Sequence, residues 1–268
     1  MKVLYITQEI MPYLPETEIS TICRYLPQEI QEFGKEVRTF TPRYGCISER
    51  RNQLHEVIRL SGMNLIINDA DHPLIIKVAT IQSARMQVYF IDNEEYFGRR
   101  QMFYDDDGEY FPDNDERTIF FGRGVLETVR KLRWQPNIVH CHGWFTALAP
   151  LYIKKAFRED PLYSKSKVVY SIYNDGFKTP FNPEFKTKAY TDGIAKKDLA
   201  VIERPSYVSL SKLAVNFSDG LITVGEVNPD LEAYAKASNK PLIEHNTETY
   251  AMDYMNFYEK LLSNEYIN

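Results

Sequence analysis

The sequence predicts an α/β fold with a doubly wound, mostly parallel sheet. Short β-favouring apolar runs alternate along the chain with longer segments whose apolar residues recur at helical spacing. Such alternation is typical of a parallel sheet covered by helices. The first run, Lys2–Thr7, is continuously β-favouring, as expected for a strand that is buried on both faces.

The segment after this first strand has the pattern of a helix. Apolar residues recur at helical spacing over residues 19–33, and Gly34 follows where a helix end is expected. Pro27 lies inside this pattern and predicts a kink or a late start of the helix. Residues 37–41 then form the second predicted strand, which ends at a proline.

An antiparallel hairpin is expected in the middle of the chain, from strands at 74–81 and 86–91. A polar loop rich in aromatic residues follows over residues 96–115. The next predicted elements are a helix at 116–133, with its apolar side chains on one face, and a strand at 137–142.

The second half continues the alternation of helices and strands. We expect a helix at 144–157 and a strand at 168–173, followed by a flexible polar insertion at 178–204. The remaining predicted elements are a helix at 207–217, a strand at 220–224, a helix at 230–237 and a helix at 247–262. No internal repeat or low-complexity linker interrupts this pattern.

Composition excludes several classes of protein. The chain has 268 residues, of which 44% are hydrophobic and 26% charged, so it is long enough to bury a sizeable core. The net charge of −5 argues against nucleic acid or an anionic membrane as the main partner. Three widely spaced cysteines predict neither a disulfide framework nor a zinc site. The first residues do not resemble a signal peptide, so we expect a cytoplasmic protein.

Two histidines mark the carboxyl end of the strand at 137–142. Alternation along a strand places His140 and His142 on one face and Cys141 on the other, which argues against a cysteine–histidine nucleophile. A metal site would need further ligands, and the remaining histidines are isolated in the sequence. We therefore expect no metal ion and no cofactor, although the carboxyl end of such a strand is where open α/β sheets bind ligands.

Taken together, these segments resemble the N-terminal (starch synthase catalytic) domain of bacterial glycogen synthase and plant starch synthase, a GT-B type glycosyltransferase family. The resembling stretches are residues 2–12, residues 26–45, residues 107–121, residues 136–152, with the sequence PNIVHCHGWFTALAPLY, and residues 224–235. The resemblance implies a Rossmann-like domain that forms one half of a GT-B fold. The activity that it implies is transfer of glucose from ADP-glucose to an α-1,4-glucan.

The chain departs from the family where the family binds its donor. The resemblance places the family's Lys-x-Gly-Gly loop on Pro15, Glu16, Thr17 and Glu18, so its lysine and both glycines are replaced and two carboxylates are introduced. Glycines allow the backbone to approach the nucleotide sugar, and a lysine attracts its negative charge. Like charges at this position should repel a diphosphate.

Further family positions are changed. The resemblance places a catalytic-site Asp on Gly143 and the His that contacts the transferred glucose on Tyr173, so no catalytic residue is predicted. The donor- or sugar-binding positions that the resemblance implies, in weakened form, are Pro15, Thr17, Glu18, His142, Trp144 and Asn174.

The length of the chain leads to a further expectation. The family has two Rossmann-like domains with the active site between them, and 268 residues have room for one. The resemblance therefore predicts one N-terminal-type domain over residues 1–240, with the second domain absent. Residues 241–268 would form a helical tail that packs back on the domain.

Three functional readings follow. The first is a catalytically impaired family member, a pseudoenzyme that binds glucan or a partner in glycogen metabolism, with weak binding of α-glucan or ADP-glucose. The second is an active glucosyltransferase completed by another protein chain. The third is a structural or oligomerising module that has no sugar ligand, in which the acidic loop and the aromatic C-terminal helix would be interface features.

Overall fold

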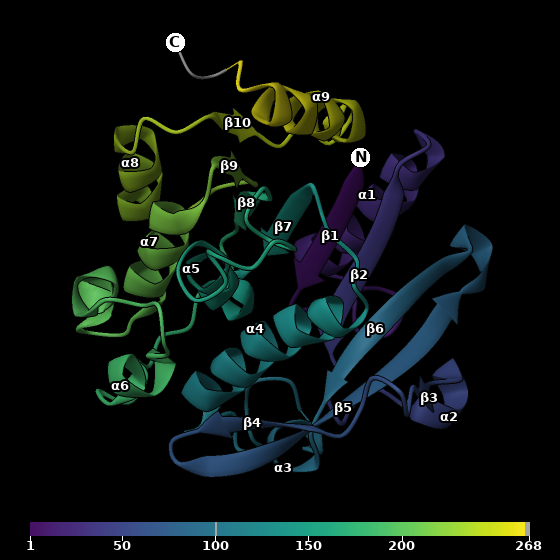
Figure 1. Ribbon diagram of the computed structural model, residues 1–268, viewed down its shortest axis with the longest axis vertical. Coiled ribbons are helices and arrows are strands. Elements are labelled where there is room, and N and C mark those ends of the chain that lie inside the picture. The colour runs from purple at the N-terminus through teal and green to yellow at the C-terminus, as the bar shows by residue number, and fades with distance from the viewer. Residues whose placement is uncertain (100, 266–268) are drawn as a thin grey trace.

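A computed structural model describes residues 1–99 and 101–265, in which most strands lie in one mixed sheet (Figure 1). The strands are β1 (Lys2–Thr7), β2 (Glu36–Pro42), β3 (His55–Glu56), β4 (Met63–Ile67), β5 (Ala70–Ile81), β6 (Met86–Asp92), β7 (Ile138–His142), β8 (Lys167–Ile172), β9 (Gly220–Thr223) and β10 (Leu242–Glu244). Their order in the sheet is β10-β9-β8-β7-β1-β2-β6-β5-β3, and β4 pairs with β5.

The sheet is parallel from β10 to β6 and antiparallel beyond it. Parallel pairs join β10, β9, β8, β7, β1, β2 and β6, whereas β5 runs antiparallel to β6, β3 and β4. The predicted doubly wound α/β class and the predicted hairpin of β5 and β6 are thus confirmed.

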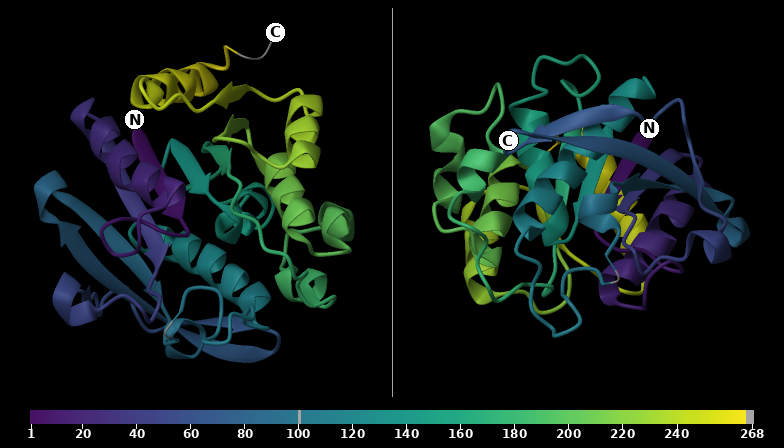
Figure 2. Two further views of the ribbon diagram at one scale, coloured as in Figure 1. Left: turned by 180° about the vertical axis from the view of Figure 1, so that it is seen from behind. Right: turned by 90° about the horizontal axis from the view of Figure 1, so that it is seen from below.

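Helices cover both faces of the sheet. The α-helices are α1 (Glu18–Glu32), α2 (Glu49–Asn52), α3 (Glu94–Phe97), α4 (Asn114–Lys131), α5 (Leu148–Lys154), α6 (Phe185–Ala189), α7 (Tyr207–Phe217), α8 (Pro229–Ala237) and α9 (Tyr250–Ser263). Helices α1 and α9 lie side by side on one face, and α4, α5 and α7 pack on the other (Figures 1 and 2). The central strands are therefore buried on both faces, which explains why β1, β7 and β8 are so apolar.

Two local expectations were wrong. The helix expected over residues 144–157 is divided into a 3-10 turn, η2 (Trp144–Thr146), and α5, because Pro150 has no N–H to donate to the preceding turn. The insertion over residues 178–204 contains α6 and a 3-10 segment, η3 (Lys196–Ile202), and is anchored to the core by Phe185, which is fully buried. Of the two alternatives predicted from Pro27, the late start is also wrong, because α1 begins at Glu18 and runs through Pro27.

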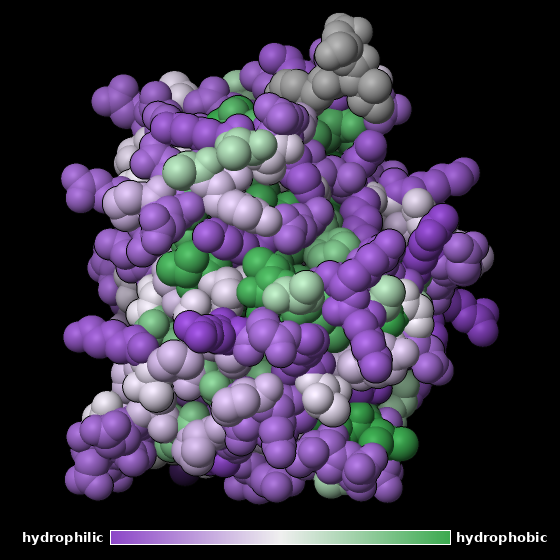
Figure 3. All heavy atoms as spheres, turned by 90° about the vertical axis from the view of Figure 1, so that its left-hand side faces the viewer, coloured by the Kyte–Doolittle hydropathy of each residue, from purple (hydrophilic) through white to green (hydrophobic). Residues whose placement is uncertain are grey.

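One face of the molecule is mainly hydrophilic. The face on the left-hand side of Figure 1, where α6, α7 and α8 lie, carries mainly hydrophilic side chains with hydrophobic ones scattered among them (Figure 3). In the part of the chain that the structure describes, no helix combines the length and the apolar character needed to cross a bilayer.

Helix α9 packs on the sheet through a row of aromatic side chains. Tyr254, Phe257 and Tyr258 are each at most 2% exposed. The Tyr258 hydroxyl is 2.6 Å from Nδ1 of His140 on β7 and 3.4 Å from the Tyr5 hydroxyl on β1. These contacts give α9 polar as well as apolar attachment to the middle of the sheet.

We predict that Tyr258→Phe lowers the free energy of unfolding by about 1 to 3 kcal/mol, because it leaves a buried imidazole nitrogen without its partner. Urea denaturation of the purified chain measures this change. Tyr190→Phe, at a tyrosine that is 51% exposed, is the matched control and should change the free energy by less than about 0.5 kcal/mol. Equal stability of the two variants would show that the hydrogen bond to His140 contributes little.

Candidate functional site

A cavity of about 300 Å³ lies where β1, β7 and β8 end. The carboxyl edge of a parallel sheet is the usual place for a ligand in α/β folds. The residues that line the cavity are Gln8, Glu9, Thr17, Glu18, Ile19, Phe103, Tyr104, Tyr110, Trp144, Tyr173, Asn174 and Asp175. They come from the β1–α1 loop and the start of α1, the loop before α4, and the residues that follow β7 and β8.

Gly143 has a backbone conformation that excludes a side chain. Its φ is 84° and its ψ is 165°, a combination that is essentially restricted to glycine. A Cβ atom at this position would lie 2.3 Å from Oε1 of Gln8. The side chain of Gln8 therefore occupies the space into which the implied family aspartate would point.

The backbone N–H groups after Gly143 are occupied by acceptors from the chain itself. The N–H of Trp144 donates to Oδ2 of Asp175 at 3.1 Å, and the N–H of Phe145 donates to Oε1 of Gln8 at 3.2 Å. Free N–H groups at the start of a helical segment are a common binding site for phosphate. Here both N–H groups are already hydrogen bonded.

The N-terminus of α1 is capped in the same way. Oγ1 of Thr17 accepts the N–H of Ser20 at 3.0 Å, and Oγ of Ser20 accepts the N–H of Thr17 at 2.8 Å. This reciprocal pair is a capping box. The first turn then places the exposed Glu18 at the cavity. At both helical starts that face the cavity, side chains of this chain thus accept some of the backbone N–H groups.

The cavity is acidic. Glu9 is only 8% exposed, and burial raises the pKa of its carboxyl to about 7. Burial also raises the pKa of Asp175 to about 6, against the opposing effect of the Trp144 N–H. Among the described residues that line the cavity, none is Lys, Arg or His.

Aromatic rings form much of the remaining wall. The Phe103 and Trp144 ring centroids are 4.9 Å apart, and the Tyr104 and Tyr110 centroids are 4.5 Å apart. The Tyr104 and Tyr110 hydroxyls also form a 3.0 Å hydrogen bond, across a short bridge in the loop before α4. The cavity therefore combines carboxylates with aromatic surface.

The structure brings together most of the positions indicated by the sequence. Thr17, Glu18, Trp144, Tyr173 and Asn174 all line the cavity, with Trp144 only 1% exposed. Pro15 is exposed in the β1–α1 loop and does not line it.

His142 also lies outside the cavity, because it is fully buried between the sheet and α9. Its Nδ1 is 2.7 Å from the Tyr173 hydroxyl, and its ring centroid is 3.8 Å from that of His140. Burial lowers the pKa of His142 to about 3 and lowers that of His140 well below its usual value. Both imidazoles are therefore neutral at physiological pH. In the described ranges, no group of three or more His, Cys, Asp or Glu residues is arranged to hold a metal ion.

Sequence reasoning missed Gln8, Glu9, Asp175 and the aromatic residues of the loop before α4. Glu9 and Asp175 each follow a buried strand by two or three residues. This position at the carboxyl edge of the sheet could have indicated that they lie at the ligand site.

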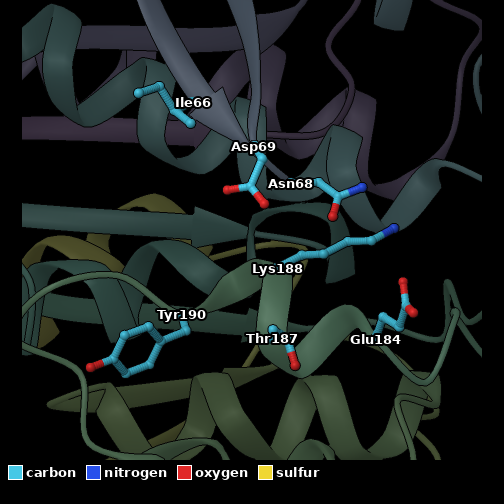
Figure 4. A pocket seen from close by; sticks show the side chains of 7 residues that line it. All are labelled: Ile66, Asn68, Asp69, Glu184, Thr187, Lys188 and Tyr190. Atoms are coloured by element: carbon cyan, nitrogen blue, oxygen red, sulfur yellow. The ribbon is translucent and has the colours of Figure 1, made fainter.

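A separate hollow of about 420 Å³ lies between the β4–β5 turn and α6 (Figure 4). Lys188 lies in it and is paired with Asp115 at 3.0 Å and with Glu116 at 2.8 Å. Tyr190 points to the opposite side from Lys188 and Glu184. Because its lysine is already neutralised, this hollow offers no free cation for an anionic ligand.

Comparisons with known proteins give a consistent result. The model of the family described as the starch synthase catalytic domain matches residues 2–227. The glycogen synthase of Chlorobium limicola is 37% identical over 174 residues, which cover 65% of this chain and 36% of that protein. The glycogen synthase of Chlorobaculum tepidum is 38% identical over 174 residues, with the same coverage. The chain thus covers 36% of the length of these relatives.

A solved structure shows the same fold. The catalytic domain of starch synthase IV from Arabidopsis thaliana, bound to ADP and acarbose, superposes with a TM-score of 0.73 at 18% sequence identity. The alignment covers 90% of this chain and 50% of that one. The fold is therefore that of one half of a GT-B glycosyltransferase.

The raised pKa of Glu9 gives stability a defined pH dependence. Because the folded chain favours the neutral acid, Glu9 contributes stability below its unfolded pKa of about 4.5, and this contribution is lost as the pH rises to about 7. We predict that Glu9→Gln increases the free energy of unfolding at pH 8 by about 1 to 3 kcal/mol, and that the gain vanishes near pH 4.5. Urea denaturation at the two pH values measures it.

Glu16→Gln is the control, since Glu16 is exposed in the same loop. It should shift stability by less than about 0.5 kcal/mol at either pH. Destabilisation of the chain by Glu9→Gln at pH 8 would contradict the assignment of Glu9 as a carboxyl group whose ionised form is disfavoured by burial.

Proposed function

Because this chain belongs to the starch synthase catalytic domain family, we propose that it is a catalytically impaired member that acts by binding glucan. In this proposal the carboxyl-edge cavity no longer accepts a nucleotide sugar. The observation that carries the proposal is the cavity itself, which presents carboxylates and capped N–H groups where the family is expected to hold its donor.

Electrostatics argue against a diphosphate in this cavity. Transfer of glucose from ADP-glucose requires positive charge or free N–H groups to stabilise the departing phosphate. The Trp144 and Phe145 N–H groups donate to acceptors of the chain, and α1 is capped by Thr17. Glu18 adds negative charge, and Glu9 adds more once the pH rises above its pKa of about 7; both charges repel a phosphate at short range.

The glycine and the tyrosine at the two implied catalytic positions also argue against catalysis. Gly143 cannot carry the implied aspartate without displacing Gln8, and Tyr173 stands where the family histidine is expected. The Tyr173 hydroxyl is engaged with His142 and is buried beneath the cavity. Neither position supplies a free acid or base to the cavity.

Aromatic surface supports a sugar-binding role. Carbohydrate rings pack on aromatic faces while their hydroxyls bond to polar groups, and the cavity offers Tyr104 and Tyr110 together with the amide of Asn174. Two other readings remain as outcomes of the test below. One is a glucosyltransferase completed by another protein chain, and the other is a structural module without a sugar ligand.

We predict that the purified chain gives no measurable glucose incorporation from ADP-glucose into glycogen, and that it is retarded in a glycogen-containing native gel. Radiolabel incorporation and the gel shift are measured on the same preparation, with bovine serum albumin as the control for retardation.

Each outcome selects one reading. Incorporation at rates comparable to those of a matched glycogen synthase would refute catalytic impairment. Incorporation that appears only after a second chain is added would favour the completed transferase. Absence of both signals would favour the structural module.

A further inference from the structure

Two hollows adjoin on the segment that contains α6 and η3. The first is the hollow of about 420 Å³ between the β4–β5 turn and α6 (Figure 4). The second, between α6 and η3, has a volume of about 510 Å³. It is lined by Pro183, Lys186, Thr187, Tyr190, Lys196, Leu199 and Glu203. Because Thr187 and Tyr190 line both hollows, the two meet at these side chains.

The ring of Tyr190 has no partner within the chain. It is 51% exposed, and among the described residues it makes no ring stacking, no contact with a cation and no side-chain hydrogen bond. A single exposed ring is ordinary at a protein surface. This ring differs because it stands between two hollows, so that its faces and its hydroxyl are open to a molecule that occupies them.

The backbone beneath the ring is fixed. Ala189, the residue before Tyr190, is fully buried, and its carbonyl accepts the Tyr152 hydroxyl at 3.3 Å. Phe185 is fully buried in the same helix, and Ile194, four residues after Tyr190, is only 3% exposed. A ligand that packs on Tyr190 therefore has little backbone to order, which favours binding.

The charges around the ring are largely paired within the chain. Lys188 is paired with Asp115 and Glu116, and Lys186 is paired with Glu203. Two of the three lysines that line the hollows are thus already neutralised. A phosphate or a nucleic acid needs a group of free cations, so this surface suits an uncharged ligand better.

An exposed ring flanked by hydrogen-bonding groups is suited to a sugar. The C–H face of a sugar unit packs on an aromatic ring while its hydroxyls bond to polar side chains. Here the Thr187 hydroxyl and the Asn68 amide supply such groups beside Tyr190. A single ring between two hollows also favours a curved chain of sugar units, since a straight chain lies better along a flat row of rings.

We propose that the two hollows around Tyr190 form a second site for an α-1,4-glucan, in which one sugar unit stacks on the Tyr190 ring and its neighbours enter the hollows. The inference rests on the proposed function, because that proposal names glucan as the ligand. It goes further by adding a site that shares no described lining residue with the carboxyl-edge cavity. Two sites on one chain bind a branched polymer together and raise the apparent affinity.

The first test is retardation of purified full-length variants in native gels of increasing glycogen concentration. Tyr190→Ala should weaken the apparent affinity by about tenfold, through loss of the ring and of the second point of attachment. Tyr190→Phe keeps the ring and should stay within about twofold of the unchanged chain. Tyr25→Ala is the matched control, at a tyrosine of α1 that is 43% exposed, and should leave retardation unchanged. Urea denaturation of each variant checks that it folds.

The second test reads the site locally. Trp134 and Trp144 are at most 4% exposed, so Tyr190→Trp adds an exposed indole whose emission is compared with that of the unchanged chain. Maltotetraose, an α-1,4 chain of four glucose units, should change this added emission at about 1 to 10 mM. Cellotetraose, the β-1,4 chain of the same length, should change it at least about fivefold less.

The outcomes separate this inference from the proposed function. Unchanged retardation of Tyr190→Ala, or an added emission that does not respond to maltotetraose, would overturn the second site and leave the proposed function in place. An equal response to cellotetraose would overturn the assignment to an α-glucan. Weakened retardation of Tyr190→Ala with unchanged retardation of Tyr110→Leu would support the second site and overturn glucan binding in the carboxyl-edge cavity. Absence of retardation of the unchanged chain would overturn both.

Discussion

The hydrogen bond between Tyr258 and His140 joins the last helix to the middle of the sheet, across 118 residues of sequence. A layer of other buried polar side chains surrounds this hydrogen bond. They include Ser171, whose hydroxyl is 2.7 Å from Nε2 of His140. Partners for buried polar atoms stabilise such a layer, although Nε2 of His142 has none among the described residues. With α9 in place the imidazoles remain neutral, and the carboxyl ends of β1, β7 and β8 are held together beneath the cavity.

The cavity above this layer lies at the carboxyl edge of a sheet whose fold the chain shares with a starch synthase structure. The strands and the helical starts occupy the arrangement expected of the family, and the superposition with the starch synthase IV structure reflects this. At this edge, backbone N–H groups donate to the side chains of Thr17, Asp175 and Gln8. The chemistry of the carboxyl edge thus depends on a few side chains of this chain, which accept hydrogen bonds from the N–H groups at the starts of the helical segments.

Sequence reasoning was reliable where the pattern is local and periodic. The strand Lys2–Thr7 and the helix Tyr207–Phe217 have the predicted bounds, because burial on both faces or on one helical face leaves a clear apolar signature. The short strand β4 and the segment with α6 were missed, since their few buried residues, such as Phe185, are stabilised by distant parts of the chain. Thr17, Glu18 and Asn174 could be assigned to the cavity from family positions, whereas Glu9 and Asp175 were missed although each follows a buried strand. Their raised pKa values could not be predicted, because they arise from the folded surroundings.

The contact between Gly143 and Gln8 has a consequence for how this domain can change over generations. A single substitution that places an acid at position 143 meets both the Oε1 atom of Gln8 and a backbone conformation suited to glycine. Gln8 cannot simply be removed either, because it accepts the Phe145 N–H. Placing an acid at position 143 therefore calls for coordinated replacements in two loops, because either change alone disturbs a contact that the other residue makes.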